Sequence, residues 1–223
     1  MPGRIVPLIF GQLYHVFNRG IDHRPTFTDK REYQRANESI SYYRLRNLPI
    51  SLSKYLRLDK ERKLEMSKLL VKSEKLVEIH SYCFMPNHFH FLLKQVFDNG
   101  ISKFLSNFQN GYTRYFNTKH KRDGSLFLDQ FKAVRIESDE QLVHVSRYIH
   151  LNPYTGYVIK RVEDLLSYEW SSFKEYLTQN EGNITEKTLI LGFFPSREKY
   201  KRFILNQADY QKRLKEIEHL IFE

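Results

Sequence analysis

Two histidines separated by one residue are the strongest chemical signal in the sequence. His88 and His90 flank Phe89 in a run of aromatic and aliphatic residues, which is typical of a buried strand. Because side chains two positions apart on a strand lie on the same face, both imidazoles can reach one metal ion while Phe89 faces the core. Two imidazoles are an incomplete ligand set, and two strand histidines with a structural role would have the same spacing. The pair alone therefore leaves metal binding open.

A tyrosine and an asparagine near residue 150 offer the parts that the histidine pair lacks. Tyr148 and Asn152 are four residues apart in a segment with helical spacing, so they project from the same side of a helix. The amide oxygen of Asn152 could complete a metal site, with Tyr148 one turn away as a nucleophile. Ordinary packing of an amphipathic helix is the alternative role for Tyr148.

The chemistry open to such a tyrosine is attack on a phosphodiester. A phenol has a pKa of about 10 and is a weak nucleophile at neutral pH. Attack becomes feasible if a divalent ion polarises the phosphoryl oxygen. The product would be a 5′-phosphotyrosine link with a free 3′-hydroxyl, and the reverse attack could join a different DNA end.

The elements that must position these residues alternate in the order strand, helix, strand, strand, helix, strand. We expect strands at 13–17, 76–84, 88–96 and 130–136, and helices at 29–45 and 101–119. This order predicts an α+β fold of the ferredoxin-like class, also found in RNA-recognition sheets, with an antiparallel sheet, helices on one face and the other face available for a site. A further helix should begin at Ser138 or Asp139 and end near Asn152 and Pro153, since proline cannot continue the backbone bonding.

Two helical additions accompany this predicted sheet domain, which spans residues 1–160. An insertion at about 46–76 is rich in Leu, Lys, Arg and Glu, and its residues 51–75 contain no Gly or Pro, which predicts an exposed, basic, amphipathic helical segment. Residues 161–223 form a helical C-terminal extension that we expect to pack on the sheet domain. Trp170 and Phe173 are its predicted packing anchors.

The composition favours a polyanionic partner. The chain has 36 Lys and Arg against 26 Asp and Glu, a formal charge of +10, which points to nucleic acid first and an acidic membrane surface second. A solvated basic surface without such a partner fits the charge equally well. The single cysteine, Cys83, excludes an intramolecular disulfide and a cysteine-based metal cluster. With no signal-peptide pattern and no apolar run of about 20 residues, we expect a cytoplasmic protein.

Six sequence stretches together resemble a known family. Residues 82–93, YCFMPNHFHFLL, resemble the His-hydrophobic-His signature of the single-tyrosine transposases of the IS200 type, and among these the transposases associated with repetitive extragenic palindromes. The other matching stretches, which bring the coverage to about residues 10–175, are 14–20, 124–127, 131–133, 147–153 and 170–173. One such motif would be weak evidence, but six in the same order are strong.

The resemblance implies a metal-dependent enzyme that cuts and rejoins single-stranded DNA beside a hairpin during transposition. It implies Mg²⁺ or Mn²⁺ at His88 and His90, Asn152 as the third ligand and Tyr148 as the nucleophile. Whether such a chain acts as a monomer or a homodimer, and which DNA sequence it recognises, stays open.

Two further tyrosines are rival nucleophiles. Tyr112 and Tyr115 rank lower because the apolar stripe of their helix should pack on the back of the sheet.

Basic side chains that fall in or near the matching stretches are candidate DNA contacts. An exposed, solvated role is equally open for each of them: Arg19, Arg114, Lys132 and Arg135.

Two rival functions stay in view. The same fold could serve as a catalytically silent module that binds single-stranded nucleic acid or a hairpin. An unrelated metal hydrolase would need a carboxylate beside the histidines, for which Asp129 and Glu137 are the nearest candidates by strand position. Presence of both histidines together with Tyr148 and Asn152 argues for the enzyme, because a pure binder needs none of them.

Overall fold

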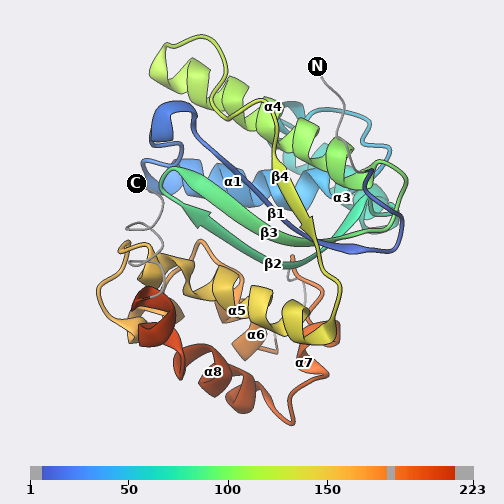
Figure 1. Cartoon of the computed structure of the whole chain (residues 1–223). Helices are drawn as coiled ribbons and strands as arrows, with labels where there is room; N and C mark the ends of the chain where they lie inside the picture. Colours follow the sequence, from blue (N-terminus) through green and yellow to red (C-terminus); the bar gives the residue numbers. More distant parts are fainter. Residues whose placement is uncertain (1–6, 180–183, 214–223) are drawn as a thin grey trace.

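A four-stranded antiparallel sheet lies at the centre of the molecule (Figure 1). The structure is a computed structural model that describes residues 7–179 and 184–213. The strands run in the spatial order β2-β3-β1-β4, and they are β1 (Leu13–Arg19), β2 (Val77–Met85), β3 (His88–Gln95) and β4 (Lys132–Arg135). With one helix connecting β1 to β2 and another connecting β3 to β4, this is the ferredoxin-like arrangement. The predicted fold class is confirmed.

One face of the sheet is covered by two long helices, α1 (Lys30–Tyr43) and α4 (Gly100–His120). The predicted apolar stripe of α4 is buried against aromatic side chains of β2 and β3. The largest fully buried rings of this core are Phe84, Phe89, Phe91, Phe104, Phe108 and Tyr112. Asp29 caps α1, with its carboxylate accepting from the backbone N of Glu32 at 3.0 Å.

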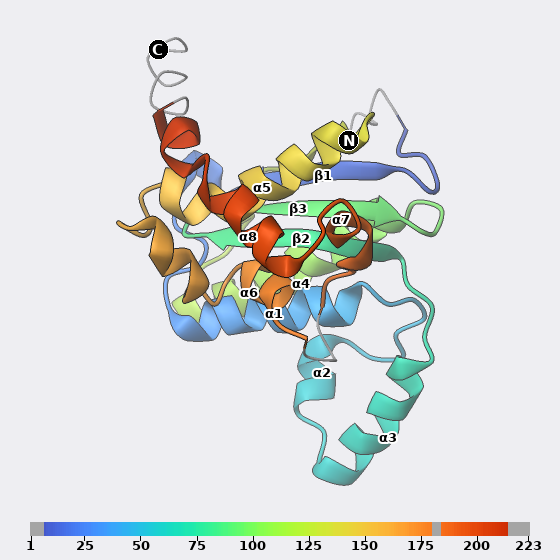
Figure 2. The ribbon, with the colours of Figure 1, turned by 90° about the horizontal axis from the view of Figure 1, so that it is seen from below.

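The opposite face is covered only in part, by α5 and the C-terminal extension. Figure 2 shows α5, α6 and α8 across this face, and their apolar side chains pack with Cys83, Met85 and Leu92 of β2 and β3. The elements are α5 (Asp139–Thr155), η2 (Val162–Leu166), α6 (Phe173–Leu177), α7 (Thr188–Leu191) and α8 (Arg197–Leu205). The part of the face over β1 and β4 is left for a cavity described below.

Helix α5 is longer than predicted. Ser138 caps its start, with Oγ accepting from Gln141 N at 3.1 Å, but the helix continues through Pro153 to Thr155 instead of ending near Asn152 and Pro153. Proline removes only one backbone donor from the last turn, and the Gly156 N–H bonds to Asn152 O at 2.8 Å, so the turn still closes. The extra residues carry part of the cavity wall.

The insertion consists of two helices where one amphipathic segment was expected. These are α2 (Leu52–Leu56) and α3 (Lys60–Val71), and Figure 2 shows them projecting away from the sheet. Asp59 starts the second helix by accepting from Arg62 N at 2.9 Å. Helix α3 contributes no buried residue, in agreement with the predicted exposure. A short 3₁₀ turn, η1 (Ile21–His23), follows β1.

The extension is joined to the edge of β2 by backbone bonds. Tyr82 O accepts from Ser172 N at 2.9 Å, and Phe84 N donates to Trp170 O at 2.9 Å, so residues 170–172 cover that edge. Trp170 stacks on Tyr33 with ring centroids 4.9 Å apart, and Phe173 is fully buried. Both predicted packing anchors are confirmed. Among the described residues, no helix has the length and apolar character needed to cross a membrane.

A buried polar network fastens α5 to the extension. His150 hydrogen-bonds through Nε2 to Ser172 Oγ at 2.7 Å and through Nδ1 to Tyr200 OH at 2.8 Å. Tyr200 OH also bonds to Ser146 Oγ at 2.7 Å. Burial lowers the pKa of His150 to about 3, so the ring is neutral in the folded protein across the physiological range.

The buried His150 makes stability depend on pH. Because the unfolded chain takes up a proton near pH 6.5 and the folded ring does not until about pH 3, stability should fall as the pH drops through this window. His150→Gln should remove that contribution, which amounts to up to about 1.4 kcal/mol per pH unit. Urea unfolding between pH 7 and 4 measures the difference in slope. His144→Gln, on the exposed side of the same helix, should keep the wild-type slope, and equal slopes for wild type and His150→Gln would contradict the assignment.

Candidate active site

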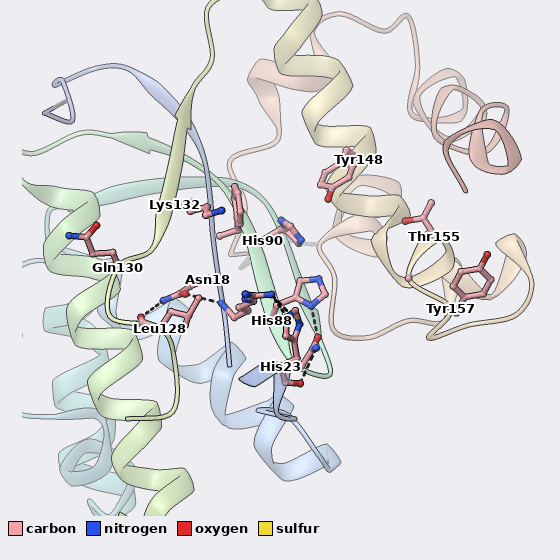
Figure 3. Close-up of a pocket in the computed structure, with 14 residues that line it drawn as sticks. Asn18, His23, His88, His90, Leu128, Gln130, Lys132, Tyr148, Thr155 and Tyr157 are labelled. Atoms are coloured by element: carbon pink, nitrogen blue, oxygen red, sulfur yellow. Dashed lines mark hydrogen bonds between the residues drawn. The ribbon is translucent and has the colours of Figure 1, made fainter. Parts of the chain in front are cut away.

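A cavity of about 580 Å³ opens on the uncovered part of the sheet, between β4 and the end of α5 (Figure 3). Four segments that are distant in sequence line it: the end of β1 with η1, the β2–β3 turn with β3, the loop before β4 with the start of that strand, and the second half of α5 with the two residues after it. The lining residues are Phe17, Asn18, Arg19, His23, Asn87, His88, His90, Leu128, Gln130, Lys132, Tyr148, Thr155, Gly156 and Tyr157.

The two histidines of β3 meet in this cavity. Strand spacing places both rings on the cavity side, 5.0 Å apart between centroids, while Phe89 is fully buried in the aromatic core behind the sheet. The pairing of β1 with β3 sets Arg19 opposite His88 and Phe17 opposite His90. The predicted juxtaposition of the imidazoles on one face is therefore present.

Tyr148 projects from α5 toward the same rings. Its ring centroid lies 5.4 Å from that of His90, with the two planes nearly perpendicular. Figure 3 shows the hydroxyl on the side of the cavity that holds the histidines. A strand and a helix more than fifty residues apart in sequence thus bring a phenol and two imidazoles together within one chain.

The ring nitrogens of both histidines are oriented by neighbours. His88 Nδ1 bonds to Asn87 Oδ1 at 2.6 Å, and His90 Nδ1 bonds to His15 Nε2 at 3.0 Å. Histidines that ligate metals usually bond through their other nitrogen to an oriented partner, which fixes the tautomer. This donor set fits a divalent ion held through the Nε2 atoms. In the described part of the chain, no group of three His, Cys, Asp or Glu residues is arranged to hold a metal.

His15 is a site residue to which sequence reasoning assigned no role. It lies on β1 beside His90, with ring centroids 5.2 Å apart, and its ring makes a T-shaped contact with that of Tyr148, with centroids 5.7 Å apart. Burial lowers its pKa to about 4, so the ring is neutral near pH 7 and its Nε2 can accept from His90 Nδ1. The signal was present, since His15 and Phe17 alternate on one strand face within a matching stretch.

Of the four predicted DNA contacts, two line the cavity. Arg19 and Lys132 do so, and the Arg19 guanidinium also bonds to the His23 ring. Arg135 pairs with Tyr14, whose side chain is buried in the core behind the sheet, so Arg135 belongs to the opposite face. Arg114 lies on α4, in a separate polar groove.

The predicted third ligand is not in the cavity wall. Asn152 is fully buried one turn beyond Tyr148, and its Nδ2 donates to the backbone O of Tyr148 at 3.0 Å. Its assignment as a ligand therefore rests on the spacing and on the family resemblance.

The rival groups also lie outside the cavity wall. Tyr112 is fully buried behind the sheet, where its hydroxyl donates to Thr26 O at 2.6 Å, and burial raises its pKa far above the usual value. Burial also raises the pKa of Tyr115 on the same helix. Neither Asp129 nor Glu137 lines the cavity.

Comparisons with known proteins show the family and the fold of the chain. Residues 13–152, more than half of the chain, match the model of the family described as IS200-like transposases. No curated protein sequence matches the chain significantly. Seven solved chains match it, among them the REP-associated tyrosine transposase bound to a REP hairpin, with a TM-score of 0.54 and 15% identity over 85% of this chain and 96% of that chain. At this identity the likeness shows a shared fold.

The bond from His15 to His90 should matter for metal affinity. His15→Phe keeps a ring but removes the acceptor, and loss of such an orienting bond typically costs about 10- to 100-fold in metal affinity. Titration calorimetry with Mn²⁺ should show this loss, while His15→Gln, which keeps an acceptor oxygen, should lose less. His144→Gln is the control for an exposed histidine. Unchanged Mn²⁺ affinity in His15→Phe would contradict the orienting role.

Proposed function

The chain belongs to the IS200-like transposase family, and from this premise we propose that it is a metal-dependent single-stranded DNA endonuclease and strand transferase. The observation that carries the proposal is the position of Tyr148, 5.4 Å from the ring of His90 and in one cavity with His88. A binding module needs neither a nucleophile nor paired imidazoles at that place. Since all three side chains come from one chain, the site needs no second copy.

The residues that would hold the metal are His88 and His90, through Nε2. Asn152 is the proposed third ligand through Oδ1, because its Nδ2 donates to the helix backbone; ligation requires this buried side chain to turn toward the cavity. The ion is Mg²⁺ or Mn²⁺, and when bound it polarises the phosphoryl oxygen that develops charge during attack.

The reaction itself is carried by Tyr148. Its hydroxyl oxygen bonds to phosphorus and gives up its proton, the bond from phosphorus to the 3′-oxygen breaks, and the 3′-oxygen takes up a proton. The DNA is then held as a 5′-phosphotyrosine. A 3′-hydroxyl from another end reverses the step and regenerates the phenol, so joining needs no external energy source. Arg19 and Lys132 in the cavity wall would hold the phosphates on either side.

A DNA hairpin is the proposed partner. The REP-associated tyrosine transposase that shares this fold was solved with a REP hairpin bound, and the chain carries a formal charge of +10. Arg114, Lys121 and Arg122 surround a polar groove near the end of α4, apart from the cavity. Such a groove suits the phosphates of a paired stem while the cavity takes the unpaired strand beside it.

Covalent capture tests the nucleophile. Oligonucleotides selected by the protein from a pool with a randomised hairpin and flanks are incubated with it and Mg²⁺ or Mn²⁺, and denaturing gels reveal a protein–DNA adduct. Tyr148→Phe should abolish the adduct and Tyr115→Phe should retain it. Chelator should suppress cleavage. An adduct that survives in Tyr148→Phe would sink the assignment, and tight binding without any adduct would favour the binding module.

The salt dependence of DNA binding tests the proposed phosphate contact of Lys132 in the cavity wall. In a Tyr148→Phe background, Lys132→Gln should weaken binding across sequences and reduce the slope of log K against log salt by roughly 0.7 to 0.9, the contribution of one phosphate contact. Arg135→Gln, on the same strand but on the opposite face, should leave the slope unchanged. Equal slopes for Lys132→Gln and the background protein would refute the contact.

A further inference from the structure

The end of α5 forms a cavity wall that the proposed chemistry does not use. Thr155, Gly156 and Tyr157 lie there, on the side away from Lys132 (Figure 3). Thr155 follows Tyr148 by seven residues, which is two helical turns or about 10 Å along the axis. A group bound at this wall therefore lies beside a phosphate held at Tyr148 and does not overlap it.

Thr155 presents a buried hydroxyl to this space. The residue is 4% exposed, and its Oγ1 has no hydrogen-bond partner among the described residues. Figure 3 shows the oxygen on the side that faces Tyr148 and His90. Buried hydroxyls are nearly always bonded, because loss of hydration without a replacement is unfavourable. The hydroxyl is therefore suited to bond a polar atom of a molecule that enters the cavity.

Tyr157 presents an aromatic ring beside it. The residue is 59% exposed, and its backbone has φ of 58°, a left-handed conformation that is rare and strained for an aromatic residue. The Nζ of Lys212 lies 4.5 Å from the ring centroid and supports the ring by a cation–π contact. Strain of this kind persists where surrounding contacts hold a side chain in a particular place.

The two sides of the cavity differ in chemistry. Lys132 supplies positive charge on the β4 side, which suits a phosphate. The α5 side combines a ring with a neutral hydroxyl, and Lys212, the cation that contacts the ring, is not a lining residue. Stacking on a ring together with one hydrogen bond to an edge is the chemistry that recognises an unpaired base.

The geometry points to Thr155 and Tyr157 as a subsite for the unpaired nucleobase of a nucleotide next to the scissile phosphate. The base stacks on Tyr157, and a donor or acceptor on its edge bonds to Thr155 Oγ1. This inference rests on the proposed function, since it assumes that Tyr148 faces the scissile phosphate. It adds specificity-determining contacts from the last residue of the helix that carries Tyr148 and from the turn that follows this helix.

The test combines protein variants with abasic DNA. Hairpin oligonucleotides selected by the protein receive an abasic site at each flanking position in turn, and dissociation constants are measured in a Tyr148→Phe background, where no turnover occurs. One abasic position should weaken binding about tenfold, in line with the loss of one stacked base. Tyr157→Ala should weaken binding of the intact oligonucleotide by a similar factor and should show no further loss with that abasic one.

Matched variants separate stacking, hydrogen bonding and folding. Tyr157→Phe should keep most of the affinity, Thr155→Val should lose affinity and Thr155→Ser should recover it. Tyr210→Ala, which removes an exposed tyrosine outside the cavity wall, should bind as the background protein does. If the loss of affinity caused by Tyr157→Ala adds to the loss caused by each abasic site, at every position tested, the subsite is overturned. Unchanged affinity in Tyr157→Ala would overturn it too.

Failure of the subsite and failure of the proposed function give different results. A wild-type chain that forms the Tyr148 adduct while Tyr157→Ala shows no coupling to any base overturns the subsite alone. If Tyr157→Ala and one abasic position show no further loss of affinity when combined, but the wild-type chain forms no adduct, the proposed nuclease activity is overturned and the base contact is supported. A chain that selects no hairpin oligonucleotide from the pool overturns both.

Discussion

The register of β1 against β3 is the constraint on which the rest of the site depends. Side chains alternate along a strand, so a slip of one residue would turn His90 into the core and Phe89 into the cavity. The large rings behind the sheet prevent this slip, because Phe89 and Phe91 fill a close-packed aromatic layer with α4. The same register sets Phe17 opposite His90, and His15 reaches His90 from the same strand face. Packing on one side of the sheet thus determines chemistry on the other.

The position of the proposed nucleophile depends on a second, independent attachment. Tyr148 and His150 are two residues apart on α5, so their side chains point about 200° apart around the helix. Tyr148 faces the cavity while His150 is locked to Ser172 and Tyr200 of the extension. Residues 170–172 in turn bond to the backbone of β2, the strand next to β3. The C-terminal extension therefore contributes no residue to the cavity wall, yet it fixes the angle at which Tyr148 meets the histidines.

Local patterns predicted the strands, the two long helices and the shared face of His88 and His90, because each depends on a period within a single element. They could not predict which residues of neighbouring strands lie side by side in the sheet. The approach of His15 to His90 follows from which strands pair and in what register, and a single strand does not encode that. Alternation along β4 does separate Lys132 from Arg135, but strand pairing decides which of the two faces the cavity. Thr155 was missed for a different reason: Pro153 marks a helix end by propensity, but tertiary packing and one remaining backbone bond carry the helix past it. The proposed ligation of a metal by Asn152 requires a side-chain rotation, which spacing alone does not predict.

Charge and shape act at different ranges in this molecule. The excess of ten positive charges favours the approach of a polyanion such as the proposed DNA, over distances up to about a Debye length and without regard to sequence. Inside the cavity, Arg19 and Lys132 suit phosphates, which position a strand but carry no sequence information. Any discrimination between bases must then come from neutral groups that touch them. The wall formed by Thr155 and Tyr157 has that character. Thr155 is the last residue of the helix that carries Tyr148, and Tyr157 follows two residues later, so selection of a base and placement of the phosphate would be geometrically coupled.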